Sequence, residues 1–168
     1  SIRDFVAKAS TRIEESILSD LQLIRPSAGL LNHNVSKTGD GRDEFVLAVS
    51  GSANFVRGNS HFAISLALRT NGETKIALVY SPIDERLYYA EYGVGAYVFS
   101  AYHSEKIHVS NLTESVDLTI GYNTTGNRPI IEGAARETGC PALDLAWVAA
   151  GKMSAFISDP LDYAEMAA

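Results

Sequence analysis

The sequence predicts an α/β fold in which a mixed sheet with many antiparallel hairpins is layered with helices. Between residues 45 and 122, short segments rich in β-branched and aromatic residues follow one another closely. Turn signals separate these segments. Asn71-Gly72 is a strong one, because both residues tolerate the positive φ of a tight hairpin turn. Helical patterns flank this run at residues 11–24 and Pro141–Ala150. This order favours helices packed on the faces of one extended sheet.

The first helix is expected over residues 11–24. Thr11 and Glu14 have capping-box spacing, in which each side chain bonds a free backbone N–H at the helix start. Its apolar face is formed by Ile13, Ile17, Leu18, Leu21 and Ile24. The helix is expected to end before Pro26, because proline lacks the N–H that would continue the helical hydrogen bonds. The next polar, glycine-containing segment, residues 32–44, is expected to be a loop.

The remaining elements are short strands and one further helix. The expected strands are Phe45–Val49, Phe62–Leu68, Lys75–Tyr80, Arg86–Glu91, Gly95–Phe99, Ile107–Val109, Leu118–Tyr122 and Ala155–Ser158. Hairpin turns are expected at Asn71-Gly72 and Tyr92-Gly93. A late helix over Pro141–Ala150 is expected to end at Gly151, since glycine readily takes the left-handed conformation of a helix end.

Composition limits the partners and the compartment. The chain has 168 residues, 46% of them hydrophobic, and a net charge of −6. Nonspecific binding to nucleic acid or to an anionic membrane requires basic patches, so neither is expected. The single Cys140 excludes an internal disulfide and indicates a reducing compartment, so we expect a cytoplasmic location. No apolar run approaches transmembrane length.

Residues 45–58 carry the most informative pattern. An apolar strand runs into Ser50-Gly51-Ser52 and then into Asn-Phe-x-x-Gly, which begins at Asn54. The pattern resembles the signature of the inositol monophosphatase family, Asp-Pro-[Ile/Leu]-Asp-Gly-Thr followed by Thr-Asn-Phe-x-x-Gly. Further segments resemble the family in the same order, at residues 61–68, 79–91, 93–97 and 142–151. The chain is therefore identified as a member of this family, of the bacterial extragenic-suppressor type.

The resemblance implies a layered α/β sandwich of the sugar-phosphatase type, formed by residues 1–168 as a single domain. Relative to the family, that domain is expected to lack the first helix and the C-terminal segment. The segment near residues 127–139 is also shorter than its counterpart in the family.

The resemblance also implies a magnesium-dependent phosphatase, but the residues at its functional positions have changed. Metal-binding carboxylates of the family align with His33, Leu47, Ser50 and Glu165, and a glutamate that contacts substrate aligns with Ser158. Only Glu165 is acidic, and Mg²⁺ prefers several carboxylate oxygens. We therefore expect degenerate metal motifs, no bound metal and no cofactor, with Glu165 as the remaining catalytic position.

Three functions remain open. The first is a catalytically impaired homologue that keeps the fold as a binding or regulatory module. The alternative is an active metal-dependent phosphomonoesterase on inositol phosphate or a related small sugar phosphate, with Mg²⁺ as its cofactor. A set of His33 and Glu165 with Asp40, Asp43 or Glu44 would favour Zn²⁺ or Mn²⁺ instead. The third is a small-anion sensor at the Ser50 turn.

Phosphate binding does not require the missing carboxylates. The resemblance places Gly51, Ser52 and Ala53 at the start of a helix, where free N–H groups attract anions. Hydroxyl groups of Ser50 and Ser52 would add donors. We expect this turn to hold phosphate or a small sugar phosphate without metal. The resemblance further implies a homodimer and a protein partner from the transcription machinery.

Overall fold

The computed structural model describes residues 2–32, 36–37, 39–114, 117–124, 133–159 and 161–168. Its helices are α1 (Ile2–Ile24), α2 (Ser52–Val56), α3 (Pro141–Ala149) and α4 (Tyr163–Met166). The larger sheet contains β1 (Gly29–Leu31), β2 (Ser36–Lys37), β3 (Asp43–Ser50), β4 (Ala63–Thr70), β5 (Glu73–Ser81), β6 (Arg86–Glu91), β7 (Gly95–Phe99) and β8 (Ser104–Lys106). The smaller sheet contains β9 (Thr119–Thr124), β10 (Ala134–Arg136) and β11 (Ala155–Asp159).

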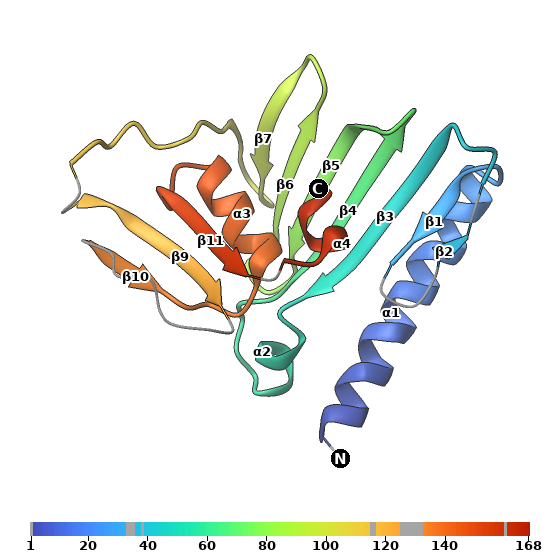
Figure 1. Ribbon diagram of the computed structural model, residues 1–168, viewed down its shortest axis with the longest axis horizontal. Coiled ribbons are helices and arrows are strands. Elements are labelled where there is room, and N and C mark those ends of the chain that lie inside the picture. Colours follow the sequence, from blue (N-terminus) through green and yellow to red (C-terminus); the bar gives the residue numbers. More distant parts are fainter. Residues whose placement is uncertain (1, 33–35, 38, 115–116, 125–132, 160) are drawn as a thin grey trace.

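The larger sheet has the order β2-β1-β3-β4-β5-β6-β7-β8. Its neighbours pair antiparallel except β1 and β3, which are parallel. The smaller sheet, β10-β9-β11, is parallel throughout. The predicted α/β fold with a mixed, mostly antiparallel sheet is therefore confirmed (Figure 1).

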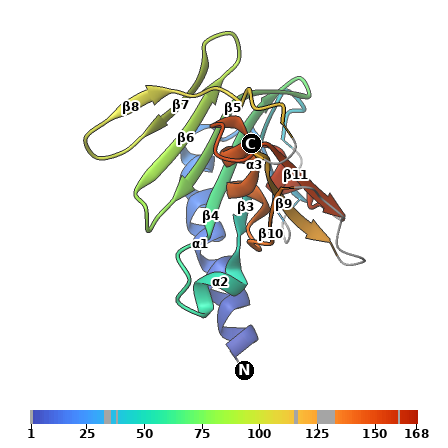
Figure 2. The same cartoon turned by 90° about the vertical axis from the view of Figure 1, so that its left-hand side faces the viewer.

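The two faces of the larger sheet carry different layers, since successive strand residues point to opposite faces. On one face, Leu18 of α1 packs with Leu30, Phe45 and Leu47. On the other, Val46 and Ala48 of β3 pack with Ala67 and with Ala164 of α4. α3 covers the same side over β4 and β5, with Leu143 and Ala146 against Ala63 and Val79. α1 and α3 thus pack on opposite faces of this sheet, and both are labelled in Figure 2.

Strands and hairpins agree closely with the sequence prediction. Asn71 and Gly72 have φ values of 52° and 81°, as the predicted tight turn requires. β6 and β7 have the predicted bounds, and α3 ends one residue earlier than predicted. Gly151 has the expected positive φ of 68°. These features form from residues that are neighbours in the sequence, which is why the pattern predicts them.

Three expectations were wrong. α1 begins at Ile2, so Thr11 lies inside the helix and there is no capping box at residues 11–14. The strand expected at Ile107–Val109 is replaced by β8 at Ser104–Lys106, which pairs with β7. The loop expected over residues 32–44 includes β2 and the start of β3. In the part of the chain that the structure describes, no helix is both long and apolar enough to cross a membrane.

Candidate functional site

β3 carries two of the predicted site positions, and it separates them. Leu47 and Ser50 are both fully buried. Because β3 is regular through Ser50, residues three apart point to opposite faces. Leu47 packs under α1, whereas Ser50 bonds to groups in α3 and α4. The two positions where the family resemblance places aspartates therefore do not converge.

Ser50 and Glu165 are the predicted positions that the structure brings together. The Ser50 hydroxyl donates to Glu165 Oε1 at 2.6 Å. Ser50 Oγ also accepts a hydrogen bond from Ala142 N, in the first turn of α3, at 3.3 Å. Ser50 thus uses its hydroxyl both as donor and as acceptor within the protein.

The turn after Ser50 requires glycine. Gly51 has φ of 78°, and a Cβ atom at this position would lie 2.8 Å from His61 O. Asn54 supports the turn, since its Nδ2 donates to His61 O and Thr138 O at 2.7 Å each. In the five-residue α2, the N–H groups of Asn54 and Phe55 donate to Gly51 O. The Gly and Asn of the sequence pattern thus have a structural role here, and Ser52 and Ala53 form the first turn of α2.

The other predicted positions lie elsewhere or outside the described residues. Ser158 belongs to β11, and its hydroxyl donates to Asn123 O on the neighbouring β9 at 3.1 Å. His33 lies outside the described residues. Asp43 and Glu44 lie at the opposite end of β3 from Ser50, roughly 20 Å away at about 3.3 Å per strand residue. They form ion pairs there with Arg25 and Arg69.

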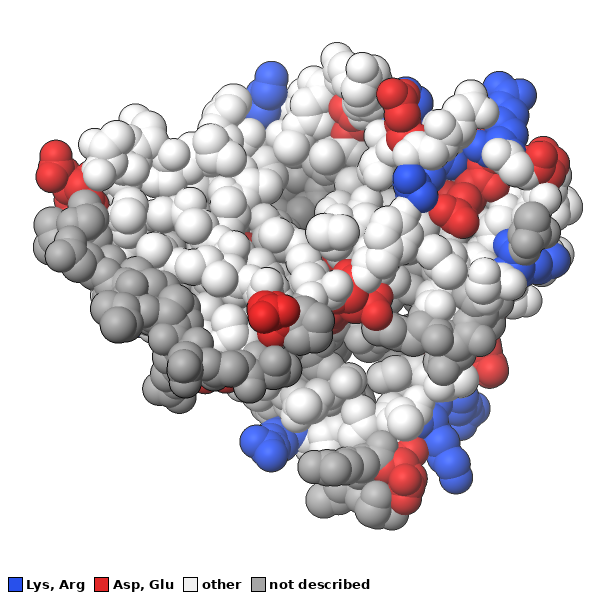
Figure 3. Space-filling view, viewed as in Figure 1, with Lys and Arg blue, Asp and Glu red and all other residues white. Residues whose placement is uncertain are grey.

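The cleft at that far end is lined by mixed charges. A cavity of about 270 Å³ is bordered by Lys37, Arg42 and Arg69 together with Asp43 and Glu44. Figure 3 shows basic and acidic side chains interspersed at this end of the sheet. The acidic residues named as replacement ligands are therefore not gathered around Glu165.

Sequence reasoning missed a buried carboxylate near the end of β3. Glu14 of α1 is 3% exposed, its Oε2 accepts from Asn32 Nδ2 at 2.8 Å, and its Oε1 accepts from Val49 N at 3.4 Å. The signal was its position four residues before Leu18, on the face of α1 that packs against the sheet. Glu14 ties α1 to the strand that carries Ser50.

A second missed group lies at the start of α3. Asp144 is fully buried, its Oδ1 lies 3.3 Å from His61 Nε2, and its Oδ2 accepts from the Thr138 hydroxyl. The His61 ring also makes an edge contact with Trp147. Asp144 is the single charged residue in an otherwise apolar helix, and this was the available signal. The cluster fixes α3 against the turn that follows β3.

Cys140 is excluded as a nucleophile by its surroundings. Burial raises the pKa of its thiol to about 11, and the negative charges of Asp144 and Glu165 act in the same direction. A hydrogen bond with Ser50 acts in the opposite direction without reversing the effect on the pKa. Since the thiolate is the reactive form, this thiol is inert near neutral pH.

The donors described at Ser50 do not fit Mg²⁺. The ion prefers near-octahedral oxygen ligands, usually including carboxylates. Glu165 is the carboxylate bonded to Ser50, whose hydroxyl already has two protein partners. Among the described residues, no group of three or more His, Cys, Asp and Glu side chains lies close enough to hold a metal ion. No metal-assisted step follows from this set.

Comparison with known proteins agrees with the fold. A sequence model of the inositol monophosphatase family matches residues 1–168. The inositol-1-monophosphatase of Rhizobium meliloti is 32% identical over 182 residues, covering 98% of this chain and 67% of that protein. The Nus factor SuhB of Xylella fastidiosa is 28% identical over 183 residues, covering 98% of this chain and 64% of that protein. The chain thus spans about two thirds of the length of these relatives.

A solved structure extends the similarity to three dimensions. The crystal structure of the extragenic suppressor protein suhB from Bartonella henselae superimposes with a TM-score of 0.86 at 31% identity. The match covers 98% of this chain and 70% of that one. The mixed α/β fold is thus shared with this structure.

Proposed function

Because the chain belongs to the inositol monophosphatase family, we propose that it is a catalytically impaired homologue that keeps the fold as a binding or regulatory module. One observation carries the proposal: the buried Ser50 hydroxyl bonds directly to Glu165, at a place where a divalent ion would need further carboxylates. A two-metal phosphatase uses its ions to polarise the phosphoryl group and to generate hydroxide. Without those ligands, the chemical step loses its main source of stabilisation.

Phosphate release from inositol 1-phosphate tests this proposal. The protein is assayed with Mg²⁺, Mn²⁺ and Zn²⁺ in turn, and we expect no turnover above that of the metal ions alone. Glu165→Ala provides the matched control, because it removes the carboxylate of the candidate catalytic position. Turnover by the unmodified protein that this substitution abolishes would contradict the proposal.

The alternative is an active phosphomonoesterase on inositol phosphate or another small sugar phosphate, with Mg²⁺ as cofactor. The printed name of the Rhizobium meliloti relative supports this alternative. The same assay separates the two functions, since only the alternative predicts turnover that depends on a divalent ion.

We retain phosphate binding at Ser50, Gly51, Ser52 and Ala53 as part of the proposed module. The position of Ser52 and Ala53 in the first turn of α2 supports it, because the first N–H groups of a helix can donate to an anion. The neighbouring Glu165 carboxylate opposes it, since an anion at Ser50 must first displace that group. Titration with inorganic phosphate in metal-free buffer is the measurement, and the absence of binding would remove this part of the proposal.

The remaining proposals concern partners and assembly. The name Nus factor, carried by the Xylella fastidiosa relative, supports a protein partner in transcription. A homodimer is supported by the exposed Tyr92 and Val94 at the turn between β6 and β7, which are 72% and 53% exposed. We also propose that residues 1–168 act as a single unit in the cytoplasm without direct contact with nucleic acid, in line with the net charge of −6.

A further inference from the structure

The Ser50 hydroxyl joins three segments that are far apart in the sequence. It stands at the end of β3, donates to Glu165 in α4 at 2.6 Å and accepts from Ala142 N in α3 at 3.3 Å. Ser50 has no exposed surface, so solvent cannot compensate the loss of either bond. A hydrogen bond to a carboxylate is about twice as strong as one between neutral groups. The arrangement therefore has the strength of a structural link, and its hydroxyl group is shielded from water.

The start of α3 depends on this hydroxyl. Cys140 is the N-cap residue, and its side chain makes no capping hydrogen bond. Ser50 instead supplies the acceptor for Ala142 N, which a local cap would ordinarily supply. The Ser50 hydroxyl in turn donates to the Glu165 carboxylate. A negative charge close to a helix N-terminus is stabilised by the helix dipole. One carboxylate thus supports both the cap of α3 and the position of α4.

Apart from Glu165, α4 and the residues after it contact the larger sheet through small apolar side chains and through a hydrogen bond from the Thr74 hydroxyl to Ala167 O. α4 is four residues long, and Ala164 is its buried residue, packed against Val46, Ala48 and Ala67. At its edge, Arg69 lies over the Tyr163 ring, 5.5 Å from the ring centroid. A buried methyl group holds a helical turn only weakly. The bond between Glu165 and Ser50 therefore adds a directional, charge-assisted contact to the packing between α4 and β3.

We propose that Ser50 and Glu165 form a latch that closes α4 over β3 and the start of α3 by a direct hydrogen bond, with no ion between them. This inference goes beyond the proposed function. It concerns how α4 is held on β3 and on the start of α3, which does not depend on what the protein binds. A second carboxylate in place of the hydroxyl would convert the pair into two repelling anions. Only a cation bound between them would then close the same contact.

A double-mutant cycle tests the direct bond. Ser50→Ala, Glu165→Ala and the double variant are compared with the unmodified protein by urea unfolding. We expect each single substitution to lower the folding equilibrium constant about tenfold, and the double variant to lose little more than the worse single one. Ser52→Ala combined with Glu165→Ala is the control, and these two effects should multiply. Multiplying effects for Ser50→Ala and Glu165→Ala would overturn the latch.

The charge argument has its own test in Ser50→Asp. In EDTA, we expect this variant to melt at a lower temperature than the unmodified protein, and Mg²⁺ should restore part of the loss. The melting temperature of the unmodified protein should be the same in EDTA and in Mg²⁺. Ser52→Asp, in the next turn, controls for general effects of an added charge. A Ser50→Asp variant as stable as the unmodified protein in EDTA, or one that Mg²⁺ does not stabilise, would overturn the proposal.

Discussion

Individual residues around the end of β3 are fixed by burial and by specific hydrogen bonds. Ser50, Cys140 and Asp144 are all fully buried, and each has a polar neighbour from another part of the chain. A buried polar group that loses its partner costs about 1 to 3 kcal/mol. These side chains therefore constrain one another, and their chemistry is set by the environment more than by residue type.

Cys140 gives a prediction at this scale. The folded protein raises the pKa of the thiol from 9.0 to about 11, so it holds the proton more tightly than the unfolded chain. The resulting stabilisation is complete below pH 9 and is lost as the pH rises towards 11. Such a shift corresponds to about 3 kcal/mol. Urea unfolding between pH 8 and 11 should therefore show a steeper loss of stability than in Cys140→Ala, which keeps the other groups that titrate there.

Two further results bear on this prediction. Alkylation of Cys140 by iodoacetamide at about pH 8 should be slow in the folded protein and fast in urea, because the thiolate is the reactive form. Parallel stability curves for the unmodified protein and Cys140→Ala would show that the thiol titrates as in the unfolded chain.

At the scale of elements, β3 decides what can be built at the site. It runs as a regular strand from Asp43 to Ser50 and pairs with β4 along its whole length. Alternate residues therefore belong to different cores, with Leu47 under α1 and Val46 under α4. An aspartate introduced at position 47 would not point towards Glu165.

Leu47→Asp tests the geometry of β3. The substitution places a carboxylate among Leu18, Leu30 and Phe45, where no described cation lies within the cluster. Burial of an unpaired charge is among the most destabilising changes, so we expect a loss of about 4 kcal/mol or more in chemical denaturation. Leu47→Met is the control, with an expected loss below about 1.5 kcal/mol. Full stability of Leu47→Asp, or a divalent ion bound through it, would contradict the observed register.

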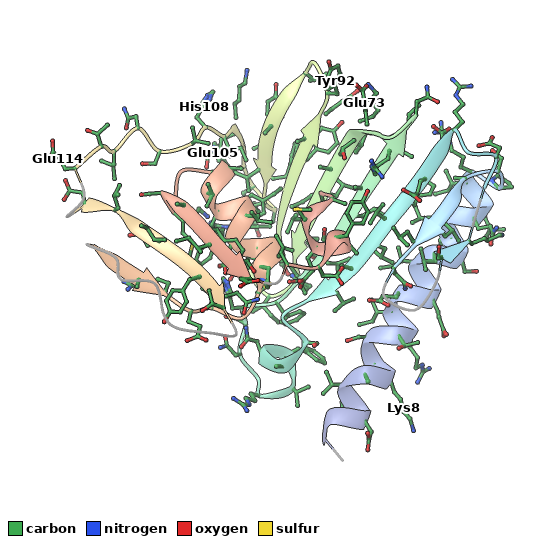
Figure 4. All side chains as sticks on the ribbon, in the orientation of Figure 1. Lys8, Glu73, Tyr92, Glu105, His108 and Glu114 are labelled. Carbon is green, nitrogen blue, oxygen red and sulfur yellow. The ribbon has the colours of Figure 1, made fainter. Side chains whose placement is uncertain are left out.

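At the scale of the whole molecule, the turn between β6 and β7 extends beyond the helical layer. The layer of α3 and α4 covers β3 to β5 and reaches Tyr88 of β6 and Val98 of β7, whereas the turn between β6 and β7 projects from the sheet (Figures 1 and 4). Tyr92 lies at this tip near Glu73, and Lys75 Nζ lies 4.2 Å from the centroid of its ring. The proposed homodimer rests on the exposed Tyr92 and Val94 of this turn.

Sedimentation equilibrium tests the proposed homodimer. The unmodified protein should sediment with twice the chain mass of 18.1 kDa at micromolar concentration. Tyr92→Asp should shift it towards the monomer, because the substitution replaces apolar surface by a charge at the turn. Lys8→Asp changes a distant position on α1 and should leave the mass unchanged. A monomeric unmodified protein, or a dimer insensitive to Tyr92→Asp, would contradict this assignment.

The sequence by itself determined the elements whose signals are local. The turn at Asn71-Gly72, the bounds of β6 and β7 and the helix that begins at Pro141 follow from residues adjacent in the chain. The family membership also follows from the sequence, since the order and spacing of its motifs predict it. The sequence also named Ser50 and Glu165 as site positions, and the structure shows a hydrogen bond between them, while their role in the site stays a prediction.

Only the tertiary structure decided how those residues meet. Ser50 and Glu165 are separated by 115 positions, and Glu14 and Val49 by 35, so no local pattern reports either contact. Which face of β3 carries Leu47 depends on the packing of α1 and α4 against opposite sides of the sheet. Buried polar groups must form hydrogen bonds, and here their partners come from segments far apart in the sequence. Such pairs are therefore defined only once the whole chain has folded.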